Sequence, residues 1–255
     1  MTPLALATAL LQAAVPTQPA PVVAATAAVA AAPFAVGERL QYSAKLGILK
    51  MGTATLTVPR LDTVRGRETY VLEFRLTAKS PFYDVDDRLT SYSTTSDFES
   101  LRFHQDFSKD DDRTFDIFPD SGYYLQAGRD ERESTPEHPV DDTSFFYFLR
   151  LAPLEVGKTY TYRNYFKDEK NPVTVKVLKR ETMEMPSGEK VPVLVLHPII
   201  DEGKGLLSKK SDTRIWITDD ARRIPLQIRG KFPFGTVTLK LEQMELPGVQ
   251  TTAGR

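Results

Sequence analysis

Apolar and polar side chains alternate with a period of two residues through most of the chain between residues 34 and 246. In the segment 70–76 (YVLEFRL), aromatic and leucine side chains alternate with Val71, Glu73 and Arg75. The segment 236–242 (TVTLKLE) separates valine and leucine from threonine, lysine and glutamate completely. Successive side chains of a strand point to opposite faces, so this pattern predicts antiparallel strands that are buried on one face.

Turn signals separate these segments at the spacing of β-hairpins. They include Arg65-Gly66, Ser187-Gly188 and Asp219-Asp220, and together they predict about eleven or twelve strands. The run 193–200 is nearly all apolar, which predicts a strand buried on both faces. Strands do not alternate with long helical segments, which argues against a parallel α/β fold. The chain is expected to be mainly β.

One helix is predicted inside this β-rich chain, at residues 141–151 (DDTSFFYFLRL). Asp141 can cap its first turn by accepting hydrogen bonds from free backbone N–H groups. Arg150 falls in the last turn, where a positive charge suits the helix dipole. Phe145 and Phe148 lie on one face. We expect this face to pack against the sheet; a gating or lid role is the alternative.

The first 33 residues differ from the rest of the chain. They are rich in alanine and proline, and the first charged side chain is Glu38. Residues 1–33 are interpreted as a signal peptide or Ala/Pro leader that is removed or disordered; the alternative is a disordered leader on a cytoplasmic protein. A single β domain is expected at 34–246, followed by a frayed tail at 247–255.

Composition excludes several classes of protein. The 33 Lys and Arg residues nearly balance 34 Asp and Glu residues, which argues against nucleic acid or a broad anionic-membrane footprint as a partner. The chain has no cysteine, so it has no disulfide, no thiolate site and no lipid-modified cysteine. The apolar run at 4–15 is shorter than the roughly 20 residues of a membrane span. No transmembrane segment, metal or cofactor is expected.

No catalytic motif is present, and no catalytic residue is assigned. The densest polar cluster is Asp86, Asp87 and Arg88, which follows an aromatic pair. Adjacent carboxylates in a strand point to opposite faces, so they cannot act together as acid and base. We expect one of them to cap a turn or to pair with Arg88. A hydrolase that uses Asp86 or Asp87 with His104 is the alternative.

Four segments, in order, resemble a bacterial exported family known as domain of unknown function 3108. They are 34–58 (FAVGERLQYSAKLGILKMGTATLTV), 82–92 (FYDVDDRLTSY), 141–160 (DDTSFFYFLRLAPLEVGKTY) and 211–242 (SDTRIWITDDARRIPLQIRGKFPFGTVTLKLE). Together they cover nearly the whole folded body. The family typically has proline after the capping aspartate, where this chain has Asp142.

The resemblance implies an exported, soluble, periplasmic protein with a strongly curved antiparallel sheet, a half-barrel or open barrel, around the inserted helix. It implies no reaction and no catalytic residues. One hypothesis is that the protein binds a lipid or other apolar envelope molecule, with Phe82, Tyr83, Phe148 and Trp216 as ligand-binding residues. The alternative is a structural or protein-interaction module of the envelope without a small-molecule ligand.

Overall fold

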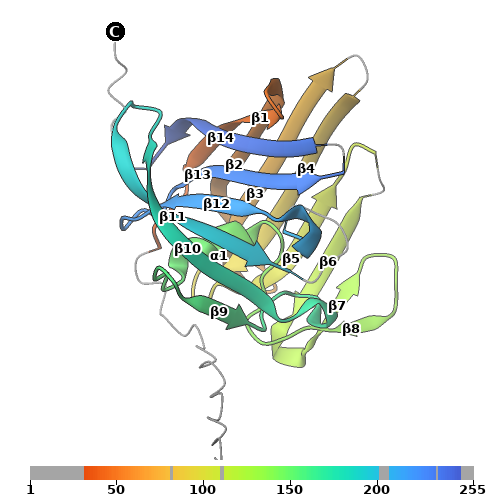
Figure 1. Cartoon of the computed structure of the whole chain (residues 1–255). Helices are drawn as coiled ribbons and strands as arrows, with labels where there is room; N and C mark the ends of the chain where they lie inside the picture. The colour runs from red at the N-terminus through yellow and green to blue at the C-terminus, as the bar shows by residue number, and fades with distance from the viewer. Residues whose placement is uncertain (1–31, 81–82, 110–111, 201–206, 234, 248–255) are drawn as a thin grey trace, which may run out of the picture.

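The computed structural model describes residues 32–80, 83–109, 112–200, 207–233 and 235–247 (Figure 1). Nearly all of the predicted leader, 1–33, and of the predicted tail, 247–255, lies outside these ranges. The described residues form one 14-stranded antiparallel sheet and one α-helix. The predicted mainly-β fold is therefore confirmed.

The chain forms its strands in sequence order, with the helix between the eighth and the ninth. The elements are β1 (Arg39–Leu46), β2 (Leu49–Val64), β3 (Arg67–Ser80), β4 (Tyr83–Thr94), β5 (Ser100–Asp106), β6 (Arg113–Phe118), β7 (Tyr123–Gln126), β8 (Arg132–Ser134), α1 (Ser144–Leu151), β9 (Thr159–Tyr162), β10 (Val173–Glu184), β11 (Lys190–Ile199), β12 (Arg214–Thr218), β13 (Pro225–Phe232) and β14 (Gly235–Glu245).

The strand order is β8-β7-β6-β5-β4-β3-β2-β1-β14-β13-β12-β11-β10-β9. The first strand therefore lies in the middle, between β2 and β14, and the sheet is built outward to two edges. The sequence predicted fewer strands because an edge strand as short as β8, with 3 residues, is too short to show alternation.

The sheet curls around its own interior, but its two outermost strands do not pair with each other, so the barrel stays open (Figure 1). Its edge strands are β8 and β9. Just beyond β8, the Thr135 hydroxyl donates a hydrogen bond to the Phe166 carbonyl oxygen over 2.7 Å. An isolated bridge joins Val140 to Tyr165. Irregular segments therefore connect the two ends of the sheet where strand pairing stops, and the result is an open barrel.

The helix fills the interior of this barrel. Every residue of α1 from Ser144 to Arg150 is buried. One apolar cluster joins α1 to residues of both halves of the sheet, such as Leu72 and Ile215. Figure 1 accordingly shows α1 in the space between β10–β14 in front and the strands behind.

The helix begins later than predicted, at Ser144 rather than Asp141. The Asp141 carboxylate nevertheless acts as the sequence suggested: its Oδ1 accepts the backbone N–H groups of Thr143 and Ser144, each over 2.9 Å. These bonds close a turn that precedes the helix.

The prediction for the run 193–200 is borne out over Val193–Leu196 of β11. All four side chains are buried, so both faces of the strand are covered there.

Candidate functional site

Buried side chains of the sheet and of α1 pack together on the inner face of the sheet. Phe148, one of the predicted ligand-binding residues, is buried in α1. Its ring centroid lies 4.9 Å from that of Tyr162 at an interplanar angle of 90°, and 6.1 Å from that of Phe145. Such pairs are the packing of a closed aromatic core.

Trp216 lies on the opposite side of the sheet from Phe148. In β12, Ile215 and Ile217 are buried in the core, whereas Trp216, between them, is half-buried on the outer face. Its indole Nε1–H donates to the Glu181 carboxylate over 2.7 Å. The structure therefore does not bring Phe148 and Trp216 together.

The other two predicted ligand-binding residues are Phe82 and Tyr83. Phe82 lies outside the described residues. Tyr83 is the first residue of β4, where its backbone is paired with Ser80 of β3.

The polar cluster at the start of β4 is arranged differently from the simplest expectation. Asp86 pairs with Arg75 of β3, through Nε–Oδ1 and Nη2–Oδ2 distances of 2.7 and 2.6 Å, and not with Arg88. The Arg75 hydrogen bonds hold the pKa of Asp86 below its usual value. The Asp87 Oδ1 accepts both the backbone N–H and the hydroxyl of Ser108, over 3.0 and 2.9 Å. The Asp86 carboxylate thus links β4 to β3, and the Asp87 carboxylate links β4 to the residues that follow β5.

His104 does not complete an acid–base pair with this cluster. It lies opposite Thr90 of β4 and Thr114 of β6. Its Nδ1 is 2.8 Å from the Thr114 hydroxyl oxygen. Its contact is a cross-strand hydrogen bond, so the geometry gives the hydrolase alternative no assembled site.

A buried polar cluster under the start of α1 was not anticipated from the sequence. It consists of Asp141 and the hydroxyls of Ser91, Ser93, Ser100 and Ser144, all fully buried. Ser100 and Ser144 are 3.0 Å apart between their oxygens, and so are Ser91 and Ser93. The sequence held one indication of this cluster: Ser91 and Ser93 are two residues apart in β4, so both hydroxyls lie on the same face of the strand.

Burial raises the pKa of Asp141 to about 6. Ser91, the Ser144 backbone N–H and Ser100 oppose this shift, in that order. The Asp141 Oδ2 is buried without a hydrogen-bond partner in the described part of the chain. The cluster has no access to solvent and can hold a proton, but it cannot reach a substrate.

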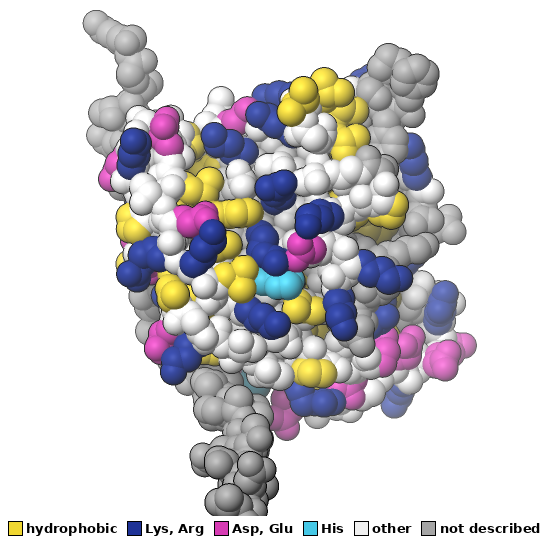
Figure 2. Space-filling model, in the orientation of Figure 1, with side chains coloured by type: hydrophobic (Ala, Val, Ile, Leu, Met, Phe, Trp, Pro, Cys, Tyr) yellow, Lys and Arg dark blue, Asp and Glu magenta, His cyan; other side chains and the backbone are white. Residues whose placement is uncertain are grey.

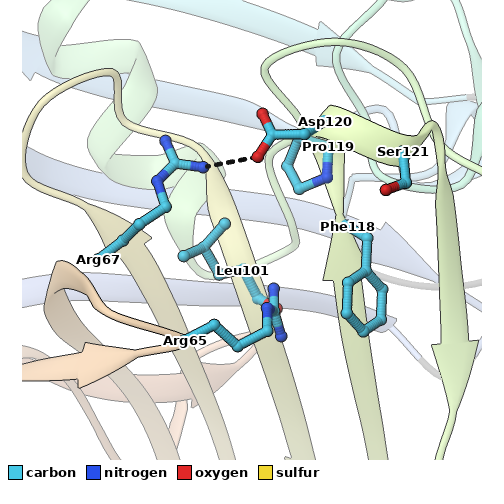
Figure 3. Close-up of a pocket in the computed structure, with 7 residues that line it drawn as sticks. All are labelled: Arg65, Arg67, Leu101, Phe118, Pro119, Asp120 and Ser121. Atoms are coloured by element: carbon cyan, nitrogen blue, oxygen red, sulfur yellow. Dashed lines mark hydrogen bonds and ion pairs between the residues drawn. The ribbon is translucent and has the colours of Figure 1, made fainter.

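A small pocket opens at the turns after β2 and β6 (Figure 3). Its volume is about 220 Å³, below the roughly 300–1,000 Å³ of most ligand pockets. Arg65 lies over the Phe118 ring at 4.3 Å and donates to the carbonyl oxygens of Leu101 and Ile117. Arg67 pairs with Glu99 over 2.7 Å and approaches Asp120 at 4.0 Å. The guanidinium groups already have partners, and an acyl chain would not fit.

The outer surface of β10–β14 and β1 is rich in cations, as Figure 2 shows in the same view as Figure 1. We call part of this surface the basic face and define it by six of the outward Lys and Arg residues on these strands. They are Lys45, Lys176, Arg214, Arg229, Lys231 and Lys240.

Strand register aligns several of these cations across the sheet. Arg214 lies opposite Arg229, which lies opposite Thr238, which in turn lies opposite Lys45. Burial, followed by the charge of Arg214, lowers the pKa of the neighbouring His197. A row of positive charge therefore crosses several strands, although the chain as a whole is nearly neutral.

Within the described ranges, no group of three or more His, Cys, Asp or Glu side chains could hold a metal ion. No helix in that part of the chain is long and apolar enough to cross a membrane.

Comparison with known proteins identifies a family and a fold. The family model described as "Protein of unknown function (DUF3108)" matches residues 41–242. A β-barrel-like protein of domain of unknown function DUF1849 from Brucella abortus is similar, with a TM-score of 0.52 and 15% identity over 84% of this chain and 98% of that chain. Its similarity shows the fold alone.

The hypothetical protein CT021 from Chlamydia trachomatis matches with a TM-score of 0.35 and 9% identity, over 83% of this chain and 89% of that chain. That likeness is too low to carry an argument. No curated protein matches the sequence.

Proposed function

Since the chain belongs to the family of unknown function DUF3108, we propose that it is an exported, non-catalytic module of the cell envelope that acts through the outer surface of its sheet. The observation that carries the proposal is the filled interior. The aromatic side chains of α1 occupy the space that a lipid carrier would leave open. A close-packed core of this kind has no room for an acyl chain.

Binding of a lipid or other apolar envelope molecule inside the sheet is the second candidate. The open edge between β8 and β9 supports it, because a barrel that lacks ladder closure can widen there. A ligand shared by Phe148 and Trp216 would require the core to rearrange, since the two side chains lie on opposite sides of β12.

Lipid extraction distinguishes the two candidates. The full chain is purified without detergent from cells that export it, and bound lipid is extracted and quantified by mass spectrometry. We expect no stoichiometric lipid and no binding of a fluorescent fatty-acid probe, with a known fatty-acid-binding protein as positive control. A stoichiometric lipid that resists phospholipase in the native protein would overturn the surface-acting proposal and support the second candidate.

Export to the periplasm, as a soluble protein without a lipid anchor, is part of the same proposal. The uncharged, alanine-rich segment before Glu38 and the absence of cysteine support it. Amino-terminal sequencing of the protein from fractionated cells should find a mature start after Ala30 or Ala32, where small residues offer a cleavage site. An intact Met1 in the cytoplasmic fraction would contradict export.

A further inference from the structure

The β1–β2 hairpin ends in an exposed apolar tip. Ile48 is 94% exposed and Leu49 is 63% exposed, whereas the other exposed large apolar side chains of the described chain, such as Val156 and Leu178, reach only 46% and 40%. Exposure of two adjacent aliphatic side chains to water is unfavourable. The tip therefore has the properties of a contact surface.

The backbone holds this tip in place. The Gly47 N–H donates to the Thr236 carbonyl oxygen of β14 over 2.8 Å. Leu46 is paired with both Leu49 and Val237. Because two neighbouring strands support the turn, the apolar tip projects from the rim of the sheet as an ordered finger.

Cations surround the base of the finger. Lys45 lies opposite Lys50 in the hairpin itself, and Lys231 lies opposite Thr236, the residue that binds Gly47. Adjacent strands are about 5 Å apart, so these charges lie within two strand spacings of the tip. They belong to, or adjoin, the basic face shown in Figure 2.

Nearby carboxylates neutralise only part of this surface. Glu242 is bound by Lys50 over 2.8 Å, and Asp212 is bound by Arg214 and Lys231 over 2.7 and 3.0 Å. In the described part of the chain, Arg229, Lys240 and Lys176 form no ion pair. The balanced charge of the whole chain hides this excess because most of the acidic residues lie outside β10–β14 and β1.

We infer that the β1–β2 finger and the adjoining basic face dock the protein on an anionic phospholipid bilayer. A bilayer presents anionic phosphate groups above an apolar layer, and this surface presents cations behind an apolar tip in the same order. The inference rests on the proposed surface-acting function and names its partner.

Vesicle binding tests this inference with the full chain. Vesicles of phosphatidylethanolamine and phosphatidylglycerol are compared with vesicles of phosphatidylcholine alone, by sedimentation and by the fluorescence of Trp216, the only tryptophan. We expect binding to the anionic vesicles alone, weakened by added salt because screening reduces the charge attraction. Equal binding to both kinds of vesicle, or none to either, would overturn the inference.

Two matched pairs of variants locate the contact. Ile48→Ser/Leu49→Ser should lower the partition constant on anionic vesicles about tenfold or more, whereas Leu61→Ser/Val156→Ser, at side chains that are 41% and 46% exposed, should leave it unchanged. Arg229→Glu should lower it about tenfold, whereas Lys190→Glu, at the far end of β11, should have little effect. Equal losses in the test and control variants would overturn the assignment of the site. All the replaced side chains are exposed, and circular dichroism verifies their folding.

Failure of this inference is distinguishable from failure of the proposed function. Absence of vesicle binding together with an empty interior would leave a surface module whose partner is a protein. Vesicle binding together with a stoichiometric internal lipid would support membrane docking but overturn the surface-acting proposal.

Discussion

The charged side chains on the inner side of the sheet are buried, whereas those on its outer side are exposed to solvent. On the inner side, the Glu38 and Arg150 side chains are each 1% exposed and bind each other. On the outer side, an equivalent two-bond pair, Arg75 with Asp86, has side chains that are 43% and 50% exposed. The two pairs have similar geometry but differ in their exposure to solvent. Breaking them should therefore change the free energy of unfolding by very different amounts.

This difference indicates where the molecule can change without unfolding. Inner charges are tied to fixed partners: Arg150 also donates to the carbonyl oxygens of Pro33 and Arg222, over 2.7 and 3.1 Å. Among the described residues, outer cations such as Arg229 form no ion pair and can meet a partner. The inner face therefore serves stability, and the outer face is available for binding.

The largest expected effect comes from breaking the inner pair. Arg150→Met should lower the free energy of unfolding by about 3–5 kcal/mol, because it leaves the Glu38 carboxylate buried without a counter-charge. Arg75→Met, the matched change on the outer face, should cost less than about 1 kcal/mol. Urea unfolding followed by circular dichroism measures both.

A double variant sharpens this comparison. Glu38→Leu/Arg150→Met removes both charges, so we expect it to be more stable than Arg150→Met alone. If the single and double variants are equally unstable, lost packing rather than an unpaired charge is the cause. Equal costs for Arg150→Met and Arg75→Met would contradict the distinction between the faces.

A second inner carboxyl, Asp141, should give a smaller effect with a characteristic pH dependence. Its folded-state pKa is raised to about 6, above the value of 3.8 for the free group. The resulting stabilisation is complete below about pH 4 and is lost as the pH rises through 6, a change of about 3 kcal/mol. Ionisation of Asp141 therefore opposes folding at neutral pH.

Asp141→Asn should remove this dependence. The amide oxygen can still accept the N–H groups of Thr143 and Ser144, and the amide nitrogen can donate to the serine hydroxyls. We expect the variant to be more stable than the wild type at neutral pH and similar to it near pH 4. Unfolding curves across this range test the expectation, and a variant less stable than the wild type at neutral pH would contradict it.

The sequence predicted the fold through local patterns and the family resemblance. Alternation located strands such as β3 and β14, and the apolar run identified the burial of β11. The sequence pattern did not locate the start of α1 closely. The hydrogen bonds between the Asp141 carboxylate and the backbone N–H groups of Thr143 and Ser144 form a turn before the helix, and the pattern does not distinguish this turn from a first helical turn. The edge strand β8 also escaped prediction, since three residues carry too little periodicity, whereas the alternation of Tyr160 and Tyr162 with threonines indicated the other edge strand, β9.

The site depends on strand register, which a single sequence does not reveal. Asp86 or Asp87 was expected to cap a turn or to pair with Arg88, yet register places Arg75 of β3 beside Asp86. Glu38 and Arg150 are 112 residues apart, so no local pattern connects them. The basic face was hidden for a similar reason, because net charge sums both faces of the sheet and does not report their difference.

The smallest expected effect lies on the outer face, at the hydrogen bond between Trp216 and Glu181. Hydrogen bonds from Lys179 and then from Trp216 hold the pKa of Glu181 below its usual value, so their contribution is lost as the pH falls through that lowered pKa. The Glu181 side chain is 34% exposed, and solvent screening should limit the cost of Glu181→Gln to less than about 1 kcal/mol. Glutamine keeps an acceptor for the indole N–H but removes the charge.

Trp216 fluorescence separates this local change from stability. Wild-type emission should shift on acidification as Glu181 is protonated, and the emission of Glu181→Gln should not, while the unfolding midpoint of the two proteins stays nearly the same. Vesicle binding should be at least as strong in the variant, because one negative charge beside the basic face is gone. A large loss of stability would mean that this part of the outer face behaves like the interior and would remove the distinction on which the docking inference depends.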